Sequence, residues 1–173
     1  MGSERAEAAL EASGIEYTIT RHGPVSSLEE AAAARGVDPS RVLKTIVVRR
    51  AEDDYLFVLV PGDRQISWPK LRALLGVSRL SMPDKDVARD VTGYERGTIT
   101  PFGATQAWPV VADLRVVARP GGDDVDVAGD GEGGLEAVSI GAGAHGVAAT
   151  VDGEDLVRAL GAQVADVTDP LAG

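Results

Sequence analysis

Two β-rich runs separated by only four residues constrain the fold of this chain more than any other feature. The runs are Val42–Arg50 and Tyr55–Val60, and Ala51-Glu52-Asp53-Asp54 connects them. A parallel crossover needs a dozen or more residues, so a connector this short makes the two strands antiparallel neighbours. The pattern therefore predicts a β-hairpin in the first half of the chain.

Helix and strand signals alternate along the rest of the sequence. Capping residues, a proline in a first turn and glycines after last turns predict helices at about 4–12, 27–36, 67–75, 83–89 and 152–160. Ser27 and Glu30 form an expected capping box at the start of the second of these helices. Short strands are expected near 15–19, 110–111, 114–118, 125–127, 136–140, 147–151 and 163–167. Interspersed helices and hairpins predict an α+β fold, with a mainly antiparallel, barrel-like sheet surrounded by helices in a single domain over residues 1–173.

The composition excludes several kinds of chemistry. The chain has no cysteine and only two histidines, so we expect no thiol nucleophile, no metal site and no cofactor. A formal charge of −10 argues against nonspecific nucleic-acid binding, which depends on Lys and Arg. A local basic surface remains compatible with the clustering, in the first third, of Arg35, Arg41, Lys44, Arg49 and Arg50.

The sequence predicts a cytoplasmic protein without a membrane partner. No apolar run approaches the ~20 residues that span a bilayer. The N-terminus lacks the charged and then apolar pattern of an export signal.

Lys44 is unusual because both faces of its predicted strand are otherwise largely apolar. Its ammonium group either reaches an edge of the sheet or points into a polar cavity. In a cavity it would bind a phosphate, a carboxylate or an ester oxygen.

Two glycine-rich segments are suited to binding a polar ligand through the backbone. Gly93–Gly103 contains three glycines, one proline and three hydroxyl side chains, which predicts a shaped loop. Ser139–Gly146 follows a strand, and its peptide N–H groups can face a carbonyl or a phosphate. Its glycines match the spacing of a dinucleotide-binding motif, but a strand rather than a helix follows, so the structural context of that motif is missing. The conventional acid–base candidates are His22 and His145.

Together these segments resemble the YbaK/EbsC family of aminoacyl-tRNA deacylases, which is related to the editing domain of bacterial prolyl-tRNA synthetases. The resemblance covers about residues 6–168. The matching segments are Leu43-Lys44-Thr45, Thr92-Gly93-Tyr94, Gly97–Gly103, Gly143–Gly146 and Leu156–Val167. It implies a pocket for the aminoacylated 3′ end of a mischarged tRNA, in which hydrolysis needs neither a metal nor an enzyme nucleophile.

The resemblance also implies roles for individual residues. Lys44 would engage the terminal nucleotide, and backbone groups around Gly97–Pro101 and Gly143 would hold the aminoacyl ester. The predicted catalytic residues are thus Lys44 and Gly143. The predicted substrate-binding residues are His22, Thr45, Gly97, Thr98, Thr100, Pro101, Gly103, Gly141, His145 and Gly146.

Two departures from the family pattern leave the cleared amino acid open between cysteine, alanine and others. Ala144 and His145 stand where relatives often have two basic residues, and His22 replaces a tyrosine found in some members. The leading hypothesis is a freestanding trans-editing enzyme that acts on mischarged tRNA-Pro, with prolyl-tRNA synthetase as a candidate partner. The alternatives are a non-catalytic module that binds tRNA ends or nucleotides with a synthetase, and a serine hydrolase using Ser139 and His145. The tRNA identity and the oligomeric state also stay open.

Overall fold

The β-hairpin predicted from the short connector is present. The computed structural model describes residues 2–117 and 137–171. In it, β2 (Leu43–Ala51) pairs antiparallel with β3 (Asp54–Pro61), with Lys44 opposite Val60 and Thr45 opposite Leu59. Asp53 in the turn has a positive φ of 58°, a conformation that Asp tolerates better than most residues.

The hairpin is half of a four-stranded sheet with the order β2-β3-β5-β8. Here β5 (Val110–Asp113) runs parallel to both β3 and β8 (Gln163–Ala165). These two parallel pairings were not expected from the sequence. They place β5, which follows α4, beside the hairpin and β8, which follows α5, beside β5, so the C-terminal part of the molecule joins the central sheet.

A second sheet has the order β1-β7-β6 and is antiparallel throughout. Its strands are β1 (Thr18–Arg21), β7 (Val147–Asp152) and β6 (Ala137–Gly141). Two further strands, β4 (Arg64–Ile66) and β9 (Thr168–Pro170), pair with each other and were not predicted. A parallel bridge between Val42 and Ser139 connects the two larger sheets.

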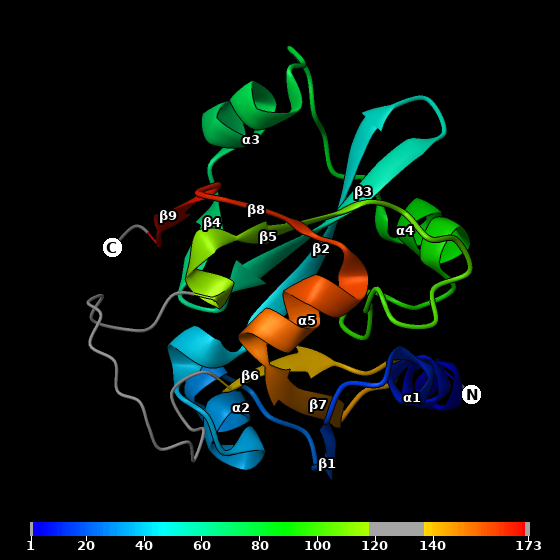
Figure 1. Cartoon of the computed structure of the whole chain (residues 1–173), viewed down its shortest axis with the longest axis vertical. Helices are drawn as coiled ribbons and strands as arrows, with labels where there is room; N and C mark the ends of the chain where they lie inside the picture. Colours follow the sequence, from blue (N-terminus) through cyan, green and yellow to red (C-terminus); the bar gives the residue numbers. More distant parts are fainter. Residues whose placement is uncertain (1, 118–136, 172–173) are drawn as a thin grey trace.

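The α+β class is therefore confirmed, whereas a barrel is not. Within the described part of the chain, four strand pairings are antiparallel and two are parallel, and the three sheets do not close into a barrel. The helices lie around the sheets (Figure 1). They are α1 (Gly2–Ser13), α2 (Leu28–Arg35), α3 (Trp68–Leu75), α4 (Lys85–Thr92) and α5 (Gly153–Leu160). None of these helices is long and apolar enough to cross a membrane.

Side-chain caps fix where several helices begin. Ser67 Oγ accepts a hydrogen bond from Lys70 N at the start of α3, as its position before Trp68 and Pro69 predicts. At α2, Ser27 Oγ accepts from Glu30 N at 3.0 Å. The return bond of the expected capping box is displaced by one residue, because Glu30 Oε1 accepts from Ser26 N at 2.9 Å.

Two predicted elements differ from the structure. Residues 114–116 form a 3₁₀ helix, η2 (Leu114–Val116), so the prediction of a strand over 114–118 was wrong for its described part, residues 114–117. The cause is local, since Asp113 Oδ2 accepts a hydrogen bond from Arg115 N and caps this turn. The helix expected at 83–89 begins later, at Lys85, because Asp84 is its cap. The strand expected at 125–127 lies outside the described residues.

The hydrophobic core lies on both faces of β3. Tyr55, Phe57 and Leu59 belong to a cluster that also includes Leu10 of α1 and Leu156 of α5. The alternate residues of β3 face a second cluster that includes Leu71 of α3. Both faces of this strand are therefore covered, which explains its nearly continuous apolar sequence.

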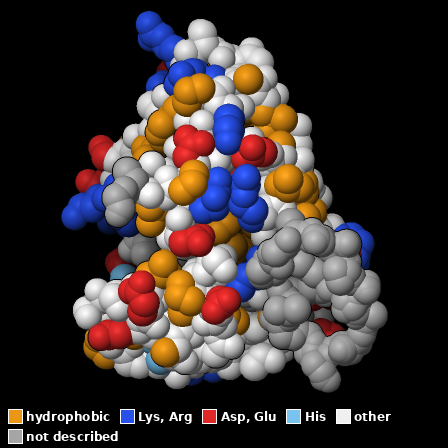
Figure 2. All heavy atoms as spheres, turned by 90° about the vertical axis from the view of Figure 1, so that its left-hand side faces the viewer, with side chains coloured by type: hydrophobic (Ala, Val, Ile, Leu, Met, Phe, Trp, Pro, Cys, Tyr) orange, Lys and Arg blue, Asp and Glu red, His pale blue; other side chains and the backbone are white. Residues whose placement is uncertain are grey.

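Basic and acidic side chains alternate on one face of the molecule, with Lys and Arg gathered near its middle (Figure 2).

Among the ion pairs of the described residues, Lys70 Nζ lies 3.1 Å from Asp166 and 3.3 Å from Asp169, and Arg115 lies 2.8 Å from Asp166. The two cations beside it lower the pKa of Asp166 to about 2. This network joins α3, η2 and the segment before β9.

Candidate active site

A cavity of about 430 Å³ brings together residues from four separate segments of the sequence. Four of its residues were predicted to bind substrate: His22, Gly97, His145 and Gly146. The full lining consists of His22, Gly23, Pro24, Val25, Arg35, Gly97, Ala144, His145, Gly146 and Val147. We take this cavity as the candidate active site, because both glycine-rich loops that the sequence singled out contribute to its wall.

Backbone hydrogen bonds hold the segments around the cavity in place. Gly143 N donates to Thr98 O at 3.1 Å, which ties the turn after β6 to the loop after α4. His22 N donates to Gly146 O at 2.9 Å, which ties the same turn to the end of β1. Gly146 has a φ of 76°, and a Cβ there would lie 2.5 Å from His22 O. The close approach at this point therefore requires glycine.

One ring nitrogen of His22 has no hydrogen-bond partner among the described residues. Its Nδ1 lies 2.8 Å from Gly23 O. A carbonyl oxygen can only accept, so in the neutral ring Nδ1 carries the proton and Nε2 has the lone pair. His22 Nε2 is buried, and among the described residues it has no hydrogen-bond partner. The ring thus contains an acceptor that the described residues leave unused.

Arg35, at the end of α2, is a lining residue that the sequence identified only as part of a basic cluster. One of its terminal nitrogens donates to Ser139 Oγ at 3.4 Å. Its Nε is buried without a partner in the part of the chain that the structure describes. Burial lowers the pKa of the guanidinium group, and among the described residues no carboxylate opposes that shift. The cavity therefore has a partly desolvated positive charge in its wall.

Lys44 and Thr45 lie on β2 and do not line this cavity. By strand alternation Lys44 shares a face with Ile46 and Val48, which pack on the α3 side of the sheet. Its Nζ donates to Arg64 O of β4 at 2.8 Å. Burial lowers the pKa of Lys44, and the charge of Asp63 partly offsets this effect. Thr45 is half-buried on the opposite face, and its Oγ1 has no partner in the described chain.

The other predicted residues shape the two glycine loops rather than lining the cavity. Thr98 and Thr100 are buried, with Thr98 Oγ1 donating to Glu95 O and Thr100 Oγ1 accepting from Phe102 N. Gly143 is buried with a φ of 90°, and its N–H is already committed to Thr98 O. The further members of this group are Gly103, Pro101 and Gly141, of which Gly103 accepts from Arg5 Nε.

The arrangement gives no support to a serine hydrolase. Ser139 is fully buried in β6, and its hydroxyl is engaged by Arg35. His145 is 72% exposed, with Nε2 3.7 Å from Glu95 Oε1. The two residues of the hypothetical nucleophile–base pair thus occupy different environments and contact different partners.

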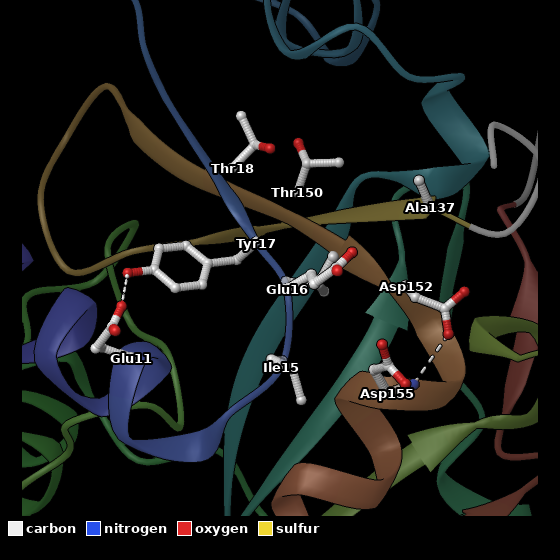
Figure 3. A pocket seen from close by; sticks show the side chains of 10 residues that line it. Glu11, Ile15, Glu16, Tyr17, Thr18, Ala137, Thr150, Asp152 and Asp155 are labelled. Carbon is white, nitrogen blue, oxygen red and sulfur yellow. Dashed lines mark hydrogen bonds between the residues drawn. The ribbon is translucent and has the colours of Figure 1, made fainter. Parts of the chain in front are cut away.

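A larger cavity, of about 740 Å³, contains none of the predicted site residues (Figure 3). Two of its carboxylates have structural partners, since Asp152 accepts from Asp155 N at the start of α5 and Glu11 accepts from Tyr17 OH. Its acidic lining would repel the phosphates of a nucleic acid. Among the described residues, no group of three or more His, Asp or Glu side chains is arranged to hold a metal ion.

The chain matches the family of the aminoacyl-tRNA editing domain over residues 22–122. Proline–tRNA ligase of Syntrophotalea carbinolica is 34% identical over 120 residues, which cover 66% of this chain and 20% of the ligase. The same enzyme of a Geobacter species is 38% identical over 88 residues, which cover 51% of this chain and 15% of the ligase. The chain thus spans a fifth or less of the length of these relatives.

Two solved structures share the fold. A candidate trans-editing enzyme for prolyl tRNA synthetase has a TM-score of 0.79 and 22% identity, over 97% of each chain. The hypothetical protein APE2540 has a TM-score of 0.78 and 24% identity, over 95% of this chain and 99% of that one. Because the family match extends over more than half of its residues, the chain belongs to the aminoacyl-tRNA editing domain family.

Proposed function

We propose that this chain is a freestanding trans-editing enzyme that hydrolyses the ester of mischarged tRNA-Pro. The observation that carries the proposal is the cavity in which His22, Gly97, His145 and Gly146 meet. The match to prolyl-tRNA ligases, whose editing region this chain resembles, supports the choice of tRNA. A net charge of −10 favours weak affinity for free tRNA, so we include prolyl-tRNA synthetase as a partner that delivers the substrate in the cytoplasm.

In this proposal the chain acts by positioning the ester and not by supplying a nucleophile. The aminoacyl ester lies against the glycine loops, with Gly97 and Gly146 allowing close approach of the ligand to the backbone. A held water, or the side chain of the mischarged amino acid, adds to the ester carbonyl. The terminal ribose oxygen then leaves with a proton. Peptide N–H groups can stabilise the oxyanion formed in between, and orientation supplies the rest of the rate increase.

Residues outside the cavity have supporting roles. Lys44 engages the terminal nucleotide where the tRNA passes the edge of the central sheet. Gly143 holds the turn that presents Ala144 to Gly146, since its own N–H is bonded to Thr98 O. Thr98 and Thr100 keep the facing loop in shape.

A panel of mischarged tRNAs, assayed with the wild type and Lys44→Ala, tests the proposal. We expect one mischarged tRNA-Pro to be deacylated well above the background rate and the variant to be much slower. Absence of cleavage for every pair would refute the enzyme. Retained tRNA binding without turnover would favour a non-catalytic binding module, and equal activity in the variant would remove the role of Lys44.

A further inference from the structure

We propose that Arg35 binds the phosphodiester group on the 5′ side of the substrate's terminal nucleoside. This inference rests on the proposed function and extends it, since it assigns the cavity to a nucleotide and not only to an ester. It starts from a cation whose hydrogen-bonding capacity the described residues leave largely unused.

A guanidinium group carries five N–H donors. In the described chain Arg35 has one hydrogen bond, a long one of 3.4 Å to Ser139 Oγ, and its buried Nε has none. A partly buried charge without a counterion is costly, and such groups normally pair with an anion. Because Arg35 lines an open cavity, a bound anion can supply the missing partner.

The chemistry of the substrate indicates which anion binds to Arg35. In an aminoacyl-tRNA the carboxyl group of the amino acid is esterified and neutral, and its amino group is positive. The phosphodiesters are therefore the anions that the substrate offers, and the planar fork of arginine matches two phosphate oxygens. The phosphodiester nearest to the ester is the one on the 5′ side of the same nucleoside.

A second lining residue fits the sugar between these two groups. His22 Nε2 is an acceptor in the neutral ring and is suited to a hydroxyl donor rather than to an anion. The free hydroxyl of the terminal ribose is such a donor. A cation and an acceptor in the wall of the same cavity thus provide complementary contacts for a ribose phosphate.

The test compares two small substrates, the aminoacyl ester of AMP and the same ester of adenosine, which lacks the phosphate. With Arg35→Gln we expect KM to rise about 10- to 100-fold for the AMP ester, the equivalent of a charged hydrogen bond. KM for the adenosine ester and kcat for both substrates should stay near the wild-type values. For Arg35→Lys, KM for the AMP ester should lie between the values of the wild type and Arg35→Gln. Arg158→Gln, which removes an exposed and already paired arginine, is the matched control and should behave as the wild type.

Protein stability separates binding from a structural role. Arg35→Gln keeps the aliphatic stem and removes a partly buried charge that has no counterion among the described residues, so it should unfold at the same or a higher denaturant concentration than the wild type. An equal rise in KM for both substrates, or clear destabilisation of Arg35→Gln relative to the wild type, would overturn the inference.

A binding measurement keeps this result independent of the proposed function. If the wild type hydrolyses neither ester, calorimetry with AMP, adenosine and inorganic phosphate still tests whether Arg35 binds the phosphate of a nucleotide. Binding of AMP that is weakened by Arg35→Gln but not by Arg158→Gln would support the phosphate contact. Equal AMP affinity in both variants, or phosphate alone binding as tightly as AMP, would overturn the assignment to a nucleotide.

Discussion

Gly143 N donates a hydrogen bond of 3.1 Å to Thr98 O, and this backbone contact joins the two glycine-rich loops of the candidate site. The two bonded residues lie 45 positions apart in the sequence. Their meeting is what turns two segments of unusual composition into the walls of one cavity.

Gly143→Ala should weaken both the fold and the site. The residue has a φ of 90°, and an added Cβ would lie 2.5 Å from Gly2 O and 2.9 Å from Tyr94 Cε1. We expect a loss of about 1–3 kcal/mol from the strained backbone and a similar loss from overpacking, measured by denaturant unfolding. Deacylation should fall as well, since a displacement of about 1 Å can reduce a rate ~10²-fold.

Gly36→Ala is the matched control for this substitution. Gly36 also has a positive φ, of 75°, but a Cβ there meets no atom within 4 Å. It should therefore show the backbone strain without the overpacking. Equal destabilisation by the two substitutions would show that the packing of Gly143 against Gly2 and Tyr94 contributes little.

Lys44 should make the stability of the protein depend on alkaline pH. Burial lowers its folded-state pKa below the ordinary 10.5, so between these two values the unfolded chain binds more protons. The free energy of unfolding of the wild type, relative to Lys44→Met, should accordingly rise as pH increases through this window. Denaturant unfolding of both proteins over an alkaline pH series measures the difference. A difference that is flat or falls with pH would contradict the burial of the ammonium group.

The features that could be predicted from sequence are those with a local cause. The hairpin follows from a four-residue connector, and α3 follows from Ser67 and the proline after Trp68. The pairing of β4 with β9 has no such signal, because each strand has three residues and the two lie about a hundred residues apart. The partner of Lys44 was hidden for the same reason, since Arg64 O belongs to β4.

The candidate site was predictable in its loops but not in its charge. The glycines that must approach other chain segments, such as Gly146, are visible in the composition of their loop. Arg35 could not be distinguished from four other basic residues in the first third of the chain. Only the folded chain shows that it faces Ser139, 104 residues away, with no carboxylate in the described part of the chain to balance it.

Asp166 should make a small, acid-sensitive contribution to stability. Its folded-state pKa is lowered from 3.8 to about 2 by Arg115 and Lys70, so its contribution is complete above pH 3.8 and disappears as the pH falls to about 2. The pairs are solvent-exposed, and we expect less than about 1 kcal/mol at physiological salt. Unfolding of the wild type and Asp166→Asn at pH 2 to 6 measures it. The difference should shrink in high salt, and a difference that grows toward acid pH would contradict the ion pairs.

His22→Asn should remove the acceptor of His22 while keeping its structural bond. An asparagine amide can still donate to Gly23 O, but it has no atom in the place of Nε2. We expect nearly unchanged stability and a KM for the aminoacyl-AMP ester that rises by about 2- to 10-fold, the equivalent of a neutral hydrogen bond. A substrate without the free ribose hydroxyl completes the cycle. The wild type should bind this deoxy substrate more weakly than the parent, whereas His22→Asn should bind the two alike. If the variant still discriminates between them as the wild type does, the hydroxyl is recognised elsewhere and His22 Nε2 faces another group of the ligand.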